Sequence, residues 1–238
     1  MRFAAAQARR SPLTRAALLL LAACSSPTGS DLSDFASGSV GTWNDGGKLG
    51  LAFMVAASSV TRGTVRAILT TPDPQVLQRS FEVNTLFGVR SRAYGWWVDS
   101  LSPRAGIYRL EAYFPGGASL NREMTVDPAS RLTPPGSPSL SFTSSQAIIR
   151  WQQVAGAAVY YVELWRLGEQ GEPVERRFDL LTDSLEVRVD LSALSLPAGT
   201  YRARVYASSA DPRNFAELRD QLRNQFNVSS LWSAPQSR

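Results

Sequence analysis

The segment DSLSPRAGIYRLEAY, residues 99–113, has a close counterpart in DLSALSLPAGTYRARVY, residues 190–206. Both pass from Asp through Leu and Pro to Ala-Gly-x-Tyr-Arg and then alternate apolar with polar residues. Such alternation is typical of a strand with one buried face, and its recurrence indicates two copies of one β unit. Tyr108 and Tyr201 begin the equivalent strands. We expect each ring to pack inward and each hydroxyl to bond to backbone just upstream.

The rest of the chain shows the same pattern of short apolar or alternating runs, which are separated by turn residues at intervals of about ten residues. This pattern predicts an all-β fold of sandwich type, with one β-sandwich in residues 37–127. The sequence Asn44-Asp45-Gly46-Gly47 predicts a tight hairpin turn between the first two strands. The strands expected in this first half are 39–43, 48–56, 64–70, 80–87, 93–99, 107–114 and 120–126.

A second β-sandwich is expected in residues 139–238, after a Pro-rich linker at 128–138, PASRLTPPGSP. Each half then has about seven strands, which is the size of an immunoglobulin-like sandwich. The strands expected in the second half are 139–142, 146–151, 158–166, 173–180, 184–191, 200–207 and 227–232.

Two stretches of the second half resemble a known family. AIIRWQQVAGAAVYYVELWR, residues 147–166, resembles the second and third strands of fibronectin type III domains, with Trp151 as the core tryptophan. LPAGTYRARVYA, residues 196–207, resembles the sixth strand. The resemblance covers most of residues 138–232 and implies a fold but no particular function. The first half resembles only a generic immunoglobulin-like sandwich.

One segment departs from that family pattern. In residues 211–225, Phe215, Leu218 and Leu222 recur at helical spacing with charged residues between them, and Asp211-Pro212 is a helix start signal. We predict a helical insertion of about three turns. One interpretation is a helix that packs on the domain's own sheet, and the alternative is an element that binds a partner.

The chain begins with the features of a secretory signal peptide. Residues 1–15 are basic, residues 16–23 form a short apolar run, and small residues precede Cys24. The apolar run extends only about 12 Å as a helix, far less than the roughly 30 Å of a bilayer core. We therefore expect residues 1–23 to be removed from the mature protein.

The stretch Leu21-Ala22-Ala23-Cys24 resembles the lipobox of bacterial lipoproteins. That resemblance implies cleavage before Cys24, lipidation of its thiol with fatty acyl chains such as palmitate, and acylation of the new amino terminus. The alternative is an ordinary signal peptide that contains a cysteine. Residues 24–36 would form a flexible tether from a membrane to the first sandwich. Since no Asp follows Cys24, sorting in two-membrane bacteria favours the outer membrane.

Composition excludes several functions. The net charge of +5 depends on four arginines of the leader, and without them 21 basic residues face 20 acidic ones, so no nucleic-acid surface is expected. The chain has no histidine, which removes the commonest general base and metal ligand. A single cysteine allows neither an internal disulfide nor a cysteine-rich zinc site. We expect no enzyme activity, no catalytic residue, no metal and no cofactor.

Aromatic and arginine side chains converge on one predicted sheet face. If alternate residues of 158–166 and 200–207 point to the core, their neighbours form an outer face that contains Tyr161, Glu163, Trp165, Arg202, Arg204 and Tyr206. Tyr, Trp and Arg are enriched at binding hot spots, so Tyr161, Trp165, Arg202, Arg204 and Tyr206 are candidate binding residues. The alternative is that arginines stack on aromatic rings across strands, beneath the 211–225 helix.

Trp96 and Trp97 must face opposite sides of their strand. One is expected in a core, and the other is either exposed or packed at the junction of the domains.

These observations favour a lipid-anchored bacterial envelope protein with a non-catalytic binding, adhesion or scaffolding role and an envelope protein or glycan as partner. The alternative function is a carbohydrate-binding accessory module or a weak carboxylate-based hydrolase of the cell envelope.

Overall fold

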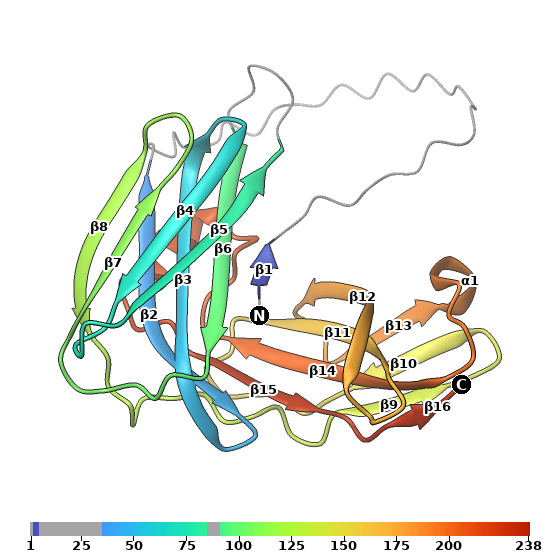
Figure 1. The fold of residues 1–238 in the computed structure, drawn as a ribbon. Coiled ribbons are helices and arrows are strands. Elements are labelled where there is room, and N and C mark those ends of the chain that lie inside the picture. The colour runs from blue at the N-terminus through green and yellow to red at the C-terminus, as the bar shows by residue number, and fades with distance from the viewer. Residues whose placement is uncertain (1, 5–34, 85–90) are drawn as a thin grey trace, which may run out of the picture.

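The computed structural model describes residues 2–4, 35–84 and 91–238, and it confirms an all-β protein with two β-sandwich lobes and short helices (Figure 1). The N-terminal lobe contains seven strands. They are β2 (Ala36–Asp45), β3 (Lys48–Val60), β4 (Gly63–Thr70), β5 (Val76–Val83), β6 (Ser91–Asp99), β7 (Ile107–Tyr113) and β8 (Ser119–Thr125).

The C-terminal lobe contains eight strands and two short helices. They are β9 (Ser139–Phe142), β10 (Gln146–Arg150), β11 (Val159–Leu167), β12 (Pro173–Thr182), β13 (Glu186–Asp190), α1 (Leu191–Leu194), β14 (Thr200–Ser208), α2 (Phe215–Gln221), β15 (Val228–Trp232) and β16 (Gln236–Ser237).

The two lobes have the same strand order, which confirms that the chain contains two copies of one β unit. In the N-terminal lobe, the strands in positions 4-3-6-7 form the four-stranded sheet β5-β4-β7-β8, while β6, β3 and β2 pair in the order 5-2-1. In the C-terminal lobe, β12, β11, β14 and β15 repeat the order 4-3-6-7, and β13, β10 and β9 repeat the order 5-2-1.

The lobes are joined edge to edge by a parallel pairing between β2 and β15. Trp43, Asn44 and Asp45 of β2 lie opposite Val228, Ser229 and Ser230 of β15. This pairing fuses sheets from both lobes into one sheet with the order β1-β6-β3-β2-β15-β14-β11-β12, in which β16 also pairs with β14. We call it the shared sheet. Figure 1 shows its N-terminal strands standing across the C-terminal ones, so the sheet turns a corner at the joint.

Each lobe encloses its own core between its two sheets. Strand alternation sends Leu51, Phe53 and Val55 of β3 into the N-terminal core, together with Trp97 of β6. The C-terminal core contains Trp151, as the resemblance to fibronectin type III domains implies, and it also takes alternate residues of β11 and β14. These residues are Tyr160, Val162, Leu164, Tyr201, Ala203 and Val205.

The two repeat tyrosines have the roles expected of them. Tyr108 is fully buried, and its hydroxyl accepts a hydrogen bond from the Arg104 amide at 2.8 Å and donates to the Arg104 carbonyl at 3.0 Å. Tyr201 is also fully buried, and its hydroxyl donates to the Pro197 carbonyl at 2.7 Å. Both rings therefore hold the turn that precedes their strand against the core.

The hairpin at Asn44-Asp45-Gly46-Gly47 is confirmed, since Gly46 and Gly47 take positive φ angles of 59° and 99° between β2 and β3. The strand expected at 80–87 is misplaced along the sequence. β5 begins at Val76, directly after the turn that Pro72 and Pro74 form, and it ends at Val83. Residues 85–90 lie outside the described residues.

The helical insertion is shorter than predicted. The helix α2 spans only Phe215–Gln221, because the residues after Asp211-Pro212 form turns before Asn214 begins the helix. The predicted apolar stripe is correct, since Phe215, Leu218 and Leu222 are all buried.

The short strand β1 (Arg2–Ala4) comes from the segment predicted to be removed as a signal peptide. It pairs antiparallel with β6 at the outer edge of the shared sheet, with Arg2 opposite Trp97 and Ala4 opposite Gly95. The rest of the leader, Cys24 and most of the tether lie outside the described residues.

The neighbouring Trp96 and Trp97 offer a test of the fold, because Trp97 lies in the N-terminal core and Trp96 packs between the lobes. We expect the wild-type lobes to unfold in one transition. Trp96→Ala should separate two transitions, while Trp97→Ala should destabilise the N-terminal lobe by about 3–5 kcal/mol. Hydrogen exchange with mass spectrometry in increasing urea resolves the lobes. Two transitions in the wild type, or one unshifted transition in Trp96→Ala, would contradict this reading.

Candidate functional site at the junction of the lobes

A third apolar cluster, the junction core, fills the inner corner of the shared sheet. It takes Ala52, Met54 and Ala56 of β3, whose alternate neighbours lie in the N-terminal core. The ring of Trp96 meets those of Tyr161, Tyr206 and Phe226 edge-on, with centroids 5.9–6.0 Å apart. β3, β6, β11 and β14 are therefore buried on both faces, and the two lobes pack as one body.

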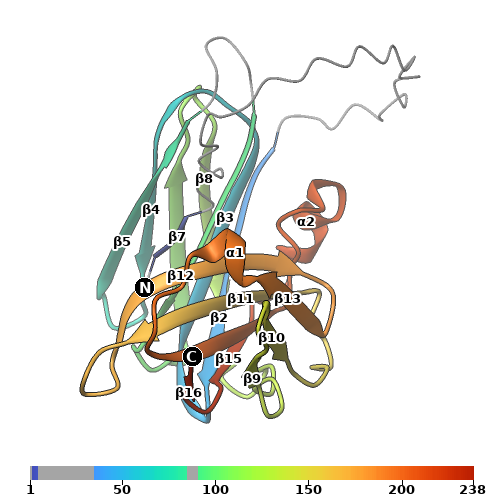
Figure 2. The same ribbon diagram turned by 90° about the vertical axis from the view of Figure 1, so that its right-hand side faces the viewer.

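The helix α2 covers this corner. Phe215 lies 6.0 Å from the Phe35 ring and 6.4 Å from the Tyr94 ring, both of which belong to the N-terminal half of the chain. Figure 2 shows α2 beside the upright strands, above the C-terminal lobe. The insertion therefore packs against the other lobe as well as its own sheet, and neither interpretation of the sequence anticipates that contact.

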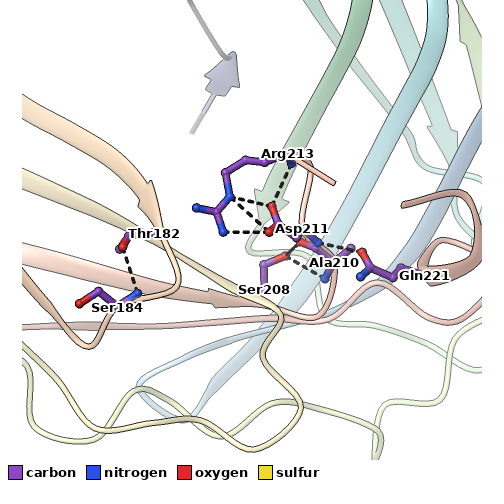
Figure 3. A network of polar contacts seen from close by, with 7 residues as sticks. All are labelled: Thr182, Ser184, Ser208, Ala210, Asp211, Arg213 and Gln221. Carbon is purple, nitrogen blue, oxygen red and sulfur yellow. Dashed lines mark hydrogen bonds and ion pairs between the residues drawn. The ribbon is translucent and has the colours of Figure 1, made fainter. Parts of the chain in front are cut away.

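The segment that leads into α2 is held by a local polar network (Figure 3). The Arg213 guanidinium donates to both carboxylate oxygens of Asp211 at 2.8–3.2 Å, and this pairing raises the pKa of Arg213. The Asp211 amide donates to the Gln221 side chain at 2.9 Å, and Ser208 donates to the Ala210 carbonyl at 2.8 Å. These bonds fix both ends of the insertion.

Buried polar side chains line the joint between β2 and β15. The Asn227 side-chain oxygen accepts from the Thr42 amide at 3.1 Å and from the Thr42 hydroxyl at 3.0 Å. At Gly41 a Cβ would lie 2.2 Å from the Phe226 carbonyl oxygen, so only glycine allows this approach. The backbones of the two lobes thus meet at a position where a side chain would separate them.

The Pro-rich segment between the lobes is bonded along this joint. Its carbonyls at Ser130, Leu132 and Thr133 accept hydrogen bonds from Thr42, Asn44 and Ser229 respectively, at 2.7–3.1 Å. Since the donors come from both lobes, the connection is held at several points along its length.

Arg204 is buried within a ring of aromatic side chains. Its guanidinium lies 4.8–5.5 Å from the ring centroids of Trp43, Tyr206 and Trp232. It also pairs with the Asp45 carboxylate at 2.8 Å, and Ser230 donates to the same oxygen at 2.7 Å. This side chain therefore ties β14, across β15, to the end of β2.

A second charged group lies on the same face. Glu163 is 1% exposed, and it accepts from the Trp165 indole at 2.9 Å and from Arg176 at 3.2 Å. Arg176 also donates to the Tyr161 hydroxyl, which donates to Asp179 at 2.8 Å. Burial raises the pKa of Glu163 above its ordinary value despite these partners, and burial also raises the pKa values of Tyr161 and Tyr206.

The five candidate binding residues share one sheet face, as predicted, but three of them are covered. Tyr206 is 0% exposed, Arg204 5% and Tyr161 7%, so the expected exposure is wrong for these three. The structure shows the alternative, with arginine stacked on aromatic rings, and adds the N-terminal lobe to the cover. Trp165 and Arg202 remain partly exposed at the rim, where Arg202 stacks on Trp232 at 5.3 Å. Ligand binding by this face stays a prediction.

Sequence reasoning missed the partners of Arg204. Trp43 and Asp45 come from the first hairpin, and Asp45 lies 159 residues before Arg204. No local pattern connects positions so far apart. The one usable indication was the pair Trp96-Trp97, for which packing at the domain junction was an expected outcome, and Trp96 confirms it.

Other parts of the described chain add little chemistry. A cleft of about 390 Å³ opens at the end of the N-terminal lobe, lined by residues that include Phe35, Ser59, Thr61 and Ser119. Residues 2–4, 35–84 and 91–238 contain no cluster of three or more metal-binding side chains. Over the same ranges, no helix has the length and apolar character needed to cross a bilayer.

The comparisons with known proteins give similarities to solved structures only. No protein-family model matches the chain, and no curated protein matches its sequence. The chain is similar to the crystal structure of a tetra-tandem repeat in the extending region of a large adhesion protein, at 14% identity and a TM-score of 0.23. The match covers 85% of this chain and 49% of that one, so this chain spans about half of its length. A similarity at this TM-score carries no argument about function.

The ion pair at the joint predicts a measurable loss of stability. Arg204→Ala leaves Asp45 without its buried partner and removes the guanidinium that the surrounding aromatic side chains contact. The substitution should lower the free energy of unfolding, measured in urea, by about 3 kcal/mol. Arg109→Ala is the matched control, because Arg109 and Glu123 are 56% and 51% exposed and solvent screens their ion pair, so its loss should have a much smaller effect. Equal effects of the two substitutions would show that the buried ion pair of Arg204 stabilises the fold no more than an exposed ion pair does.

The raised pKa of Glu163 predicts how stability depends on pH. Above the folded-state pKa, the buried carboxylate is ionised and costs stability. As the pH falls toward the ordinary value near 4.5, the folded protein takes up a proton before the unfolded chain does. The unfolding free energy of the wild type relative to Glu163→Gln should therefore rise as the pH falls through the raised folded-state pKa toward 4.5.

Glu186 gives a control of opposite sign. Arg150 and Arg188 hold the pKa of Glu186 below its usual range, so the wild type should lose stability relative to Glu186→Gln as the pH falls from about 6 to about 3. Urea titrations at each pH measure both differences. A wild type that loses stability relative to Glu163→Gln on acidification would contradict the assignment.

Proposed function

We propose that the chain is a lipid-anchored protein of the bacterial cell envelope, with a non-catalytic binding, adhesion or scaffolding role. The observation that carries the proposal is the shared sheet. Two repeats that are joined by strand pairing and a buried junction core form one rigid body, which suits a protein that holds its partner at a set position.

The proposed anchor is Cys24, at the end of the leader and before a short Ser-, Pro- and Gly-containing tether. Acyl chains contribute about 0.8 kcal/mol for each methylene buried in a bilayer, so several chains on one residue anchor a protein stably. The absence of Asp after Cys24 supports the outer membrane as the location if the organism has two membranes. The partner in this proposal is another envelope protein or a glycan.

A second candidate function is a carbohydrate-binding accessory module. The observation that favours it is the partly exposed rim of Trp165, Arg202 and Trp232, where an aromatic surface lies beside a charged donor. Binding of the protein to a glycan array that Trp165→Ala abolishes would select this candidate. A stoichiometric envelope protein that crosslinks in intact cells would select the scaffold.

Removal of the anchor is the direct test of the proposal. Cys24→Ser should abolish incorporation of labelled fatty acid and move the protein out of the membrane fraction, because the thiol that carries the lipid is gone. Ser25→Ala is the matched control and should keep both properties. Far-ultraviolet circular dichroism should show the same β content in both variants. A Cys24→Ser protein that stays in membranes like the wild type would overturn the anchor.

A further inference from the structure

The outer edge of β6 already accepts an extended segment of this chain. Arg2–Ala4 pairs with it antiparallel, in the register Arg2 with Trp97, Phe3 with Trp96 and Ala4 with Gly95. This added strand also contacts β5, which is the neighbouring edge of the facing sheet. β1 therefore lies along the side of the N-terminal sandwich where the edge strands of its two sheets, β6 and β5, come together.

The centre of β6 differs in composition from most of the other edge strands. Exposed edges are normally protected by charged side chains, and β5, β8, β12 and β13 all contain them. Residues 93–98 of β6, AYGWWV, contain none, between Arg92 and Asp99 at the ends of the strand. The short edge strand β9, SLSF, also contains none. Phe81 lies over Gly95, where a Cβ would meet its ring at 2.6 Å, so glycine leaves room for this aromatic neighbour.

We infer that the β6 edge is a strand-addition site for an extended peptide segment of a partner protein. The inference rests on the proposed function, because removal of the leader takes β1 away from the outer edge of β6. A strand edge with no charged side chain at its centre templates another strand through backbone hydrogen bonds.

The structure indicates the chemistry of the occupant. It runs antiparallel to β6, as β1 does, and spans at least three residues. Backbone hydrogen bonds supply its affinity, so its sequence is only loosely specified. The rings of Trp97 and Phe81, whose centroids lie 6.0 Å apart, line the sandwich side of this edge.

The test uses the leader as the probe. A fluorescent peptide of residues 1–8, MRFAAAQA, is titrated into the chain that begins at residue 24, with fluorescence anisotropy as the readout. We expect saturable binding, and amide exchange of residues 93–98 should slow at least tenfold when the peptide is bound. The other edge of the shared sheet, β12, should exchange at an unchanged rate.

Two matched controls separate strand addition from general adhesion to aromatic surface. The Phe3→Pro peptide loses a backbone donor and should bind at least about tenfold more weakly. The full chain of 238 residues carries β1 in place and should also bind at least about tenfold more weakly, because an attached strand competes at high effective concentration.

Each other outcome overturns the inference. Protection that falls on β12, or equal binding of the Phe3→Pro peptide, would show that β6 is not the acceptor. A chain from residue 24 that fails to fold would make β1 an integral strand. A dimer with protected β6 amides in the absence of peptide would assign the edge to a second copy. Failure of the proposed lipid anchor is tested separately, by fatty-acid labelling of Cys24→Ser and its Ser25→Ala control. That result does not change the peptide-binding results.

Discussion

The parallel pairing of β2 with β15 is the constraint on which the rest of the structure depends. β2 lies at one end of the first repeat's three strands, and β15 at one end of the second repeat's four strands. Each would be an exposed edge in a separate sandwich, with a row of unsatisfied amides and carbonyls. Pairing removes both edges at once. It also brings the outer faces of the two repeats together, so a surface that each repeat would show to water becomes the junction core.

Buried charges make that arrangement specific. Arg204 and Glu163 lie on the face that the joint covers, and each charge depends on partners that the surrounding strands supply. An angle between the lobes that separated Arg204 from Asp45 would leave a charge partly desolvated without its counter-ion, which costs several kcal/mol. Apolar contacts such as that of Trp96 with Tyr206 tolerate small shifts better. The polar groups thus select one geometry from the many that apolar packing allows.

Local patterns in the sequence predicted the parts of this structure that local forces determine. Alternation located most strands, and the repeated Tyr-Arg motif identified Tyr108 and Tyr201 because a buried ring and a nearby backbone partner both lie within a few residues. The largest error was at β5, which spans Val76–Val83 where a strand at 80–87 was expected, while β2 and β3 are longer than predicted. The joint was beyond such reasoning, because Thr42 and Asn227 meet across 185 residues. Periodicity shows which face of a strand is apolar, but it does not show what covers the opposite face.

The double burial of β6 explains why residues 93–98 at its centre carry no charges. A strand usually keeps its edge free of unwanted partners by placing Lys, Arg or Glu on its solvent face. β6 has no solvent face at its centre, since Trp97 points into the N-terminal core and Trp96 into the junction core. A charge at either position would be buried without a partner and would destabilise the joint. The joint that makes the two repeats one body therefore removes the usual protection from this edge, and the remaining way to protect the edge is to keep it occupied by another strand.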